Sequence, residues 1–234
     1  MHHFRAPDAR RFISASLMIG IAFVIFGASF GVLSVSAGAS VAQSCAMSLL
    51  VFTGASQMSA VSVIASGGTV ASAFGGAVLL SGRNAVYGLA MSPVLKQGSL
   101  ASRLLGAQWV IDETTAVVSA ETDPATRRTA FWISGAILYA SWNIGTLLGA
   151  LVGSSINPSD FGLDAAFPVM FTAMIAPHLR TSAGRKAALF GAVAAVALAP
   201  FMPIGLPILV SALGMLFGIK PTMNKQAATT DGAP

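Results

Sequence analysis

Phe12–Val35, with the sequence FISASLMIGIAFVIFGASFGVLSV, opens a run without charged residues that extends from Arg11 to Arg83. A helix needs about 20 mainly apolar residues to cross a bilayer, so this run has room for about three crossings. The chain has 234 residues, of which 55% are hydrophobic and 9% charged, and its mean hydropathy is +0.77. A soluble domain usually has about 25% charged residues. We therefore expect an all-α integral membrane protein.

Glycine, serine and proline clusters divide the apolar sequence into further helices. Leu100–Ala120 is apolar but contains Arg103, Asp112 and Glu113, so it is a further crossing, a re-entrant segment or an interfacial helix. The total is therefore about seven or eight transmembrane helices. The expected crossings are Phe12–Val35, Val41–Ala65, Val70–Leu95, Thr129–Val152, Phe161–Leu179, Lys186–Ala199 and Ile204–Ile219.

The basic residues indicate the orientation, because positive charges accumulate in cytoplasmic tails and loops. The net charge is +5, and this distribution favours a membrane topology over nucleic-acid binding. We expect a membrane transport domain over 12–219 between cytoplasmic tails at 1–11 and 220–234. The single cysteine, Cys45, excludes a disulfide within the chain and a multi-cysteine metal site. We expect no cofactor and no metal.

Gly54-Ala55-Ser56-Gln57 lies in the middle of the expected crossing at Val41–Ala65. Glycine and serine favour a kink or an unwound turn, which is tolerated at membrane depth only where it faces protein or a wet cavity. Gly54, Ser56 and Gln57 are therefore candidate ligands for a polar solute. The alternative is that Ser56 and Gln57 only bridge helices.

Ser81-Gly82-Arg83-Asn84 interrupts the next apolar stretch, and its glycine predicts a break in the helix there. Tyr87 follows Arg83 by one helical turn. A guanidinium presents a planar set of donors that suits a carboxylate. Arg83, Asn84 and Tyr87 are candidate substrate-binding residues. The alternative is that Arg83 lies at a helix end and extends to the membrane surface.

Asp112 and Glu113 are the third polar feature, inside Leu100–Ala120. A charged side chain at the centre of a membrane helix costs roughly 2.5–3.5 kcal/mol, so its presence indicates a function. Burial favours the neutral form of a carboxyl, which suits proton exchange. Asp112 is the first candidate for proton coupling and Glu113 the second. Alternatively, both acids are in water on an interfacial helix.

Two further patterns concern packing and symmetry. Gly27-x-x-x-Gly31 and Gly145-x-x-x-Gly149 allow close approach of helix backbones, either as sliding surfaces or as plain packing. Phe74-Gly75 and Phe190-Gly191 hint at two structurally repeated halves with broken helices, as in many transporters. Chance similarity between small apolar residues is the alternative.

The segment Met47–Gln57, MSLLVFTGASQ, resembles the signature of the AzlC-type branched-chain amino-acid exporters, the azaleucine-resistance family. Further similar segments follow over about residues 10–220, with Ser81 and Asn84 as departures from the family pattern. These segments are Arg83-Asn84-Ala85-Val86-Tyr87-Gly88, Asp112-Glu113, Trp142-x-x-Gly145-Thr146-x-x-Gly149 and Phe161-Gly162-Leu163-Asp164 with Pro168.

The resemblance implies a secondary transporter, not an enzyme, that exports branched-chain and other apolar amino acids across the bacterial inner membrane. It also implies a small four-span partner subunit of the AzlD type. The sequence contains no phosphate-binding loop with its lysine, so an ATPase signature is absent. The alternatives are a transporter of a different small solute and a membrane scaffold that does not transport.

Overall fold

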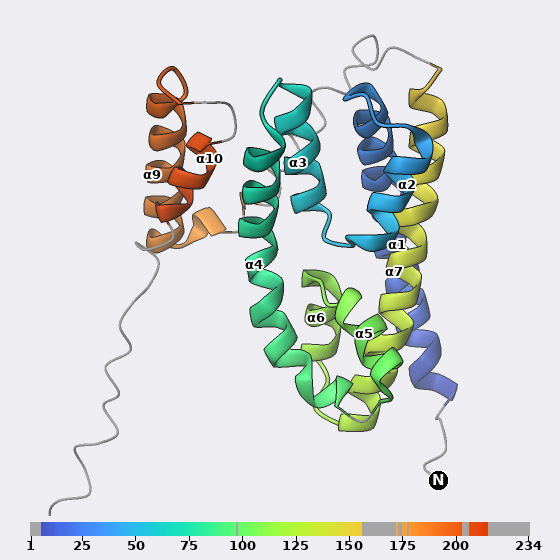
Figure 1. Ribbon diagram of the computed structural model, residues 1–234. Coiled ribbons are helices and arrows are strands. Elements are labelled where there is room, and N and C mark those ends of the chain that lie inside the picture. Colours follow the sequence, from blue (N-terminus) through green and yellow to red (C-terminus); the bar gives the residue numbers. More distant parts are fainter. Residues whose placement is uncertain are drawn as a thin grey trace, which may run out of the picture.

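The computed structural model describes residues 6–96, 98–155, 172, 175–176, 178–202 and 206–214, in which all regular elements are helices (Figure 1). Most of the expected crossing at Phe161–Leu179 lies outside the described residues, as do the two ends of Ile204–Ile219 and the C-terminal tail. The repeat expected from Phe190-Gly191 depends partly on these segments and stays a prediction.

Three long helices run the length of the bundle: α1 (Ala6–Ser36), α4 (Val70–Leu95) and α7 (Pro124–Gly153). At 1.5 Å per residue they are about 40–45 Å long, enough to cross a bilayer. Among the described helices, α1 from Ala9 and all of α7 are also apolar enough to cross. α4 has Arg83 and Asn84 near its middle, which lowers its hydropathy.

Helices α1 and α7 pack backbone to backbone. A Cβ atom added to Gly145 would lie 2.2 Å from the carbonyl oxygen of Val24, and one added to Gly149 would lie 2.0 Å from that of Ala28. Real Cβ atoms do not approach so closely, so only glycine fits at these two positions. The packing interpretation of the small-residue motifs therefore holds for this pair of helices.

The segment after α1 forms two short helices, α2 (Val41–Leu50) and α3 (Ala55–Ala65), which run in opposite directions (Figure 1). The Gln57 amide donates a hydrogen bond to the Met47 carbonyl oxygen, 3.2 Å away, across this reversal. The predicted break inside Val41–Ala65 is therefore present, but the interpretation as a single crossing is wrong. The chain turns back at about half the length of α1, as a re-entrant hairpin.

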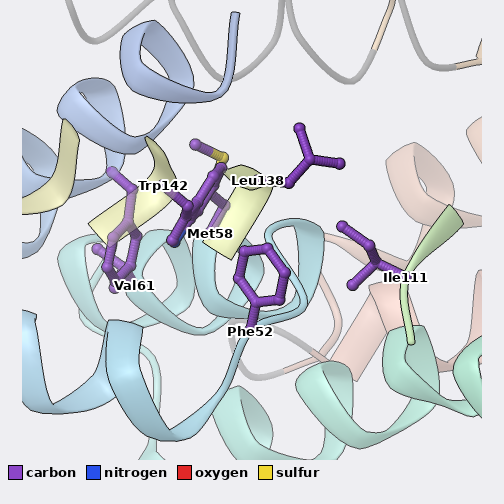
Figure 2. Packing of buried hydrophobic residues seen from close by; sticks show 7 residues of the cluster. Phe52, Met58, Val61, Ile111, Leu138 and Trp142 are labelled. Atoms are coloured by element: carbon purple, nitrogen blue, oxygen red, sulfur yellow. The ribbon is translucent and has the colours of Figure 1, made fainter. Parts of the chain in front are cut away.

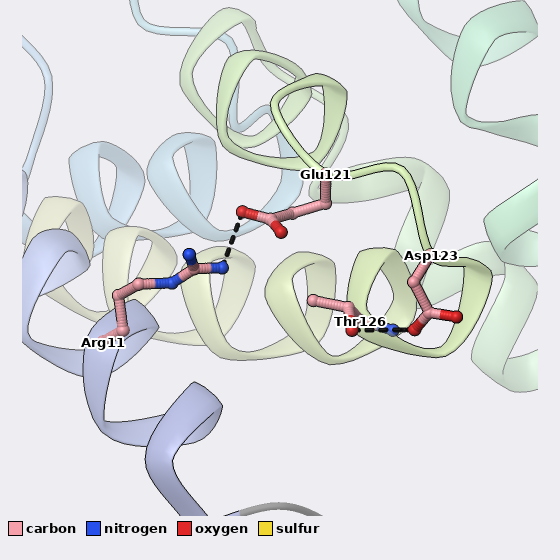
Figure 3. Close-up of polar contacts among 4 residues, drawn as sticks. All are labelled: Arg11, Glu121, Asp123 and Thr126. Carbon is pink, nitrogen blue, oxygen red and sulfur yellow. Dashed lines mark hydrogen bonds and ion pairs between the residues drawn. The ribbon is translucent and has the colours of Figure 1, made fainter.

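A second hairpin enters from the other end of the bundle: α5 (Leu100–Gln108) and α6 (Asp112–Ser119) (Figure 1). Of the three interpretations of Leu100–Ala120, the structure supports the re-entrant one. Arg11 in α1 donates to Glu121 at 2.7 Å, which ties the segment after α6 to α1. Figure 3 shows this pair beside Asp123, whose carboxylate accepts from the Thr126 backbone N–H at 2.8 Å and caps α7.

Ser81-Gly82-Arg83-Asn84 lies inside α4, which is continuous from Val70 to Leu95. The expected break at Ser81–Asn84 is therefore wrong, because a serine and a glycine in a long apolar helix do not open its hydrogen-bond ladder. Beyond α7 the described elements are a 3-10 helix, η3 (His178–Arg180), and the helices α9 (Ser182–Leu198) and α10 (Leu206–Ser211). Helix α10 contacts α4.

Two apolar clusters hold the hairpins in place. The first joins α1, the first hairpin, the start of α6 and α7, and Figure 2 shows its residues as sticks. The second joins the ends of α1, α4, α6 and α7, which lie at the other end of the bundle. The labelled residues of the first cluster in Figure 2 are Phe52, Met58, Val61, Ile111, Leu138 and Trp142.

Candidate functional site

The break in the first hairpin, Val51–Gly54, depends on one backbone conformation. Gly54 has φ +55 and ψ −82, in the region where a side chain is strained. The side chain of the fully buried Gln57 bridges the break, because its oxygen accepts from the Gly54 N–H at 3.3 Å and its nitrogen donates to Met47. The hydroxyls of Thr53 and Ser56 also hydrogen-bond. The break is thus a built feature with its own polar contacts.

The break in the second hairpin, Trp109–Ile111, is closed by the buried hydroxyl of Thr114. This hydroxyl donates to the Trp109 carbonyl oxygen at 2.8 Å and accepts from the Ile111 N–H at 3.1 Å. Helix α6 therefore begins at Asp112, with Glu113 next to it. Acidic side chains in the first turn are stabilised by the positive end of the helix dipole.

The two breaks meet at Tyr139, near the middle of α7. The Tyr139 hydroxyl donates to the Leu49 carbonyl oxygen at 2.8 Å, at the end of α2. Its ring lies 5.1 Å from the Phe52 ring and 5.8 Å from the Trp109 ring, so it contacts both hairpins. Gln108 also donates to Leu49, at 3.2 Å. The tips of the hairpins thus lie side by side at mid-height in the bundle.

Arg83 connects α4 to the second break. Its guanidinium Nη1 donates to Asp112 Oδ2 at 2.8 Å, and both side chains are 34% exposed. The Nε of Arg83 is buried and has no hydrogen-bond partner among the described residues. An arginine has five donors and no acceptor, so this ion pair leaves part of its fork available.

A cavity of about 330 Å³ lies where these elements converge. It contains the Arg83–Asp112 pair, Glu113 and the break before α3, while the rest of its lining is mostly apolar. A volume of this size suits a small solute, since ligand pockets are about 300–1,000 Å³. The lining residues are Ile19, Ala22, Phe23, Phe26, Phe52, Thr53, Gly54, Ala55, Arg83, Ile111, Asp112, Glu113 and Trp142.

A second, more open cavity of about 810 Å³ lies on the other side of the first break. It extends from the turn after α1, at Gly38, to Ser81 in α4, and Ser56 and Gln57 line it. Phe52–Ala55 line the first cavity, whereas Val51, Ser56 and Gln57 line the second. The break before α3 therefore separates the two cavities.

The structure brings together four of the eight candidate residues, since Gly54, Arg83, Asp112 and Glu113 all line the smaller cavity, hereafter the central cavity. Ser56 and Gln57 are buried at the wall of the larger one. Asn84 is in α4 next to Arg83, and Tyr87 packs against the second apolar cluster; neither lines either cavity. Their expected roles stay predictions.

The sequence analysis missed the apolar lining from α1, which includes Phe23 and Phe26, and the part played by Trp142. The lining residues of α1 recur at helical spacing, but Leu17, Ile21 and Ile25 on the other face are equally apolar and more than half exposed. A helix that is apolar all round does not reveal which face lines a cavity. Only the family resemblance pointed to Trp142.

Two breaks at mid-height, a partly buried ion pair and an apolar-lined cavity define the class as a helical membrane protein with a central polar site. Broken helices and intramembrane charges typically form the solute sites of membrane transporters. Residues 18–156 match the AzlC protein family. The chain therefore belongs to the AzlC family and is a transport-related membrane protein.

Relatives with known names agree with this assignment. The chain is 28% identical over 206 residues to the Inner membrane protein YgaZ of Escherichia coli K12, covering 82% of this chain and 84% of the relative. It is 25% identical over 183 residues to an uncharacterized membrane protein of Helicobacter pylori 26695, with 77% and 79% covered. No solved structure matches the chain.

Proposed function

We propose that the protein is a multi-pass secondary transporter of the bacterial inner membrane that exports branched-chain and other apolar amino acids. The observation that carries this proposal is the central cavity, in which Arg83 pairs with Asp112 and Glu113 also lies, while the remaining lining is mostly apolar. A zwitterion with an apolar side chain has the matching chemistry. Its carboxylate suits a guanidinium, and its ammonium suits a carboxylate.

Unpartnered donors in the cavity lining support a carboxylate ligand. Arg83 Nε and Trp142 Nε1 are buried, and neither has a hydrogen-bond partner among the described residues. A buried donor without an acceptor costs about 1–3 kcal/mol. A bound carboxylate would supply acceptors to Arg83, and the first N–H groups of α3 and the positive end of its dipole would also favour an anion.

Competition at the acids would couple export to protons. A proton bound to Asp112 or Glu113 neutralises the carboxylate that the ammonium of the substrate would pair with. Binding of the proton and binding of the substrate therefore disfavour each other. Such competition exchanges a proton for a substrate molecule. Moving one charge across 100 mV is worth about 2.3 kcal/mol, which corresponds to a concentration ratio of about forty- to fifty-fold.

A small four-span partner subunit of the AzlD type is part of this proposal and comes from the family resemblance. Affinity purification of the chain from membranes of its native host, in mild detergent, tests it. A small hydrophobic protein should copurify in a fixed ratio. Full resistance to a toxic leucine analogue from this gene alone, in a host that has no such subunit, would count against the partner.

Counterflow in liposomes tests the transport proposal and separates it from its rivals. The chain is purified from the native host together with the proteins that bind it, reconstituted with unlabelled leucine inside, and given labelled leucine outside. Transient uptake of label above that of empty liposomes is expected. A scaffold gives no counterflow with any solute, and a transporter of a different solute gives none with apolar amino acids.

A further inference from the structure

One wall of the central cavity is entirely apolar and belongs to a single helix. The four residues that α1 contributes are Ile19, Ala22, Phe23 and Phe26, spaced as i, i+3, i+4 and i+7. The charged lining residues all come from α4 and α6. A zwitterion whose charged groups are held by these residues therefore has the wall on α1 available for its side chain.

This wall cannot move away from the cavity without breaking the packing between α1 and α7. A Cβ atom on Gly27 would lie 2.4 Å from the carbonyl oxygen of Trp142, and one on Gly31 would lie 2.2 Å from that of Thr146. Phe30, which lies one helical turn after Phe26 in α1, stacks on the Trp142 ring with the ring centroids 6.1 Å apart. The distance from α1 to the rest of the site is thus fixed by direct backbone contact.

We infer that Ala22 determines the length of the amino-acid side chain that the cavity accepts. It has the smallest side chain on the apolar wall, and it lies between the bulkier Ile19 and Phe26 on the same face. Because the fixed position of α1 prevents relaxation, each carbon added at Ala22 removes room from the cavity. This inference rests on the proposed function, and it names the residue that selects among apolar amino acids.

The size of the effect follows from the energetics of apolar pockets. One methylene too many or too few in such a pocket changes discrimination by about ten- to two-hundredfold. Ala22→Leu adds three carbons to the wall, more than the difference between valine and leucine. Leucine should therefore be excluded, while alanine, which has no long side chain, should still bind.

The experiment compares wild type, Ala22→Val, Ala22→Leu and the control Ala15→Leu by counterflow, with labelled leucine, valine and alanine in parallel. Ala15 is exposed on the same helix and does not line the cavity, so the control carries the same substitution outside the site. The ratio of leucine to alanine exchange should fall at least about tenfold in Ala22→Leu, and by less in Ala22→Val. Ala15→Leu should keep the wild-type ratio.

Each result separates this inference from the proposed function. If wild type exchanges apolar amino acids and both Ala22 variants keep the wild-type ratio, only the role of Ala22 is wrong. Equal losses of leucine and alanine exchange would also overturn it, because they indicate a structural defect. If Ala22→Leu does not fold, Ala22→Val decides by the same ratio. If wild type exchanges no amino acid, the proposed function fails and this inference fails with it.

Discussion

Arg83 in the middle of α4 and Asp112 at the first turn of α6 form an ion pair at 2.8 Å, although the two residues belong to different parts of the bundle. The pair lies in the central cavity beside Glu113 and the break before α3. Asp112 occupies part of the guanidinium that a substrate carboxylate would need. Binding would then proceed by exchange of partners on Arg83.

Arg83→Ala should lower leucine binding and exchange by about ten- to a hundredfold, because hydrogen bonds to a charged group are worth about 1.5–3 kcal/mol. Arg83→Lys should restore only part of this loss, because an ammonium lacks the planar fork. Counterflow of labelled leucine measures both variants. Arg103→Ala is the control, since Arg103 is exposed in α5. Wild-type flux in Arg83→Ala would show that Arg83 does not bind the substrate.

Loss of the ion pair could also act through folding, because removal of Arg83 leaves a partly buried carboxylate without its partner. The double variant Arg83→Ala with Asp112→Asn removes this problem by neutralising both groups. It should recover membrane abundance and thermal stability relative to Arg83→Ala, while exchange stays low. Recovery of exchange in the double variant would mean that Arg83 acts only on the fold.

Asp112→Asn should abolish uphill export but leave downhill exchange of labelled leucine partly intact, because the amide cannot release a proton. Glu113→Gln tests the second acid in the same way. The measurement is export against a leucine gradient in vesicles with an imposed pH gradient, with and without a protonophore. If Asp112→Asn still accumulates leucine, and a protonophore collapses this accumulation, proton coupling depends on another group.

Gly54→Ala should destabilise the protein by about 1–3 kcal/mol, because an L side chain is strained at φ +55 and ψ −82. Space is not the cause, since the added Cβ would meet only the Trp142 ring at 3.5 Å. Gly82→Ala in α4 is the matched control: it has no positive φ and no atom within 4 Å of the added Cβ. Thermal unfolding should show a lower midpoint for Gly54→Ala than for wild type. The midpoint of Gly82→Ala should not be lowered.

Gln57→Leu should destabilise the first hairpin, because it removes the bridge between the Gly54 N–H and the Met47 carbonyl oxygen. The Met47 carbonyl oxygen would still accept from the Val51 N–H at 2.9 Å, but the Gly54 N–H would lose its partner. A donor left unpaired inside the protein costs about 1–3 kcal/mol. Exchange should fall together with the unfolding midpoint if Gln57 acts through the break. A loss of leucine exchange at unchanged stability would instead favour Gln57 as a direct ligand, as the sequence analysis proposed.

Helix positions were largely predictable from the sequence, because charge-free runs indicate the membrane helices and clusters of small residues indicate where these helices end. The expected segment Val70–Leu95 coincides with α4, and Thr129–Val152 lies within α7. The break inside Val41–Ala65 was also predictable, since Gly54 and two polar residues coincide there. The reversal of the chain at this break was not, because an apolar half-helix has the same composition as half of a crossing.

The site was predictable by residue type more than by geometry. Arg83 and Asp112 stood out as charges in apolar surroundings, but their contact is non-local and depends on how the second hairpin turns back. The expected break at Ser81–Asn84 was wrong, because glycine is tolerated inside membrane helices. The apolar wall on α1 was hidden, since Ile21 and Ile25 on its outer face are as apolar as Phe23 on its inner face.

The central claim is that the cavity between the two breaks binds a zwitterion with an apolar side chain. Calorimetric titration of the reconstituted protein with leucine, with leucinamide, which lacks the carboxylate, and with 4-methylpentanoate, which lacks the ammonium, tests it most directly. Leucine should bind at least about tenfold more tightly than either analogue, and Arg83→Ala should remove its advantage over leucinamide. Equal binding of all three compounds, or an advantage that survives in Arg83→Ala, would contradict the claim.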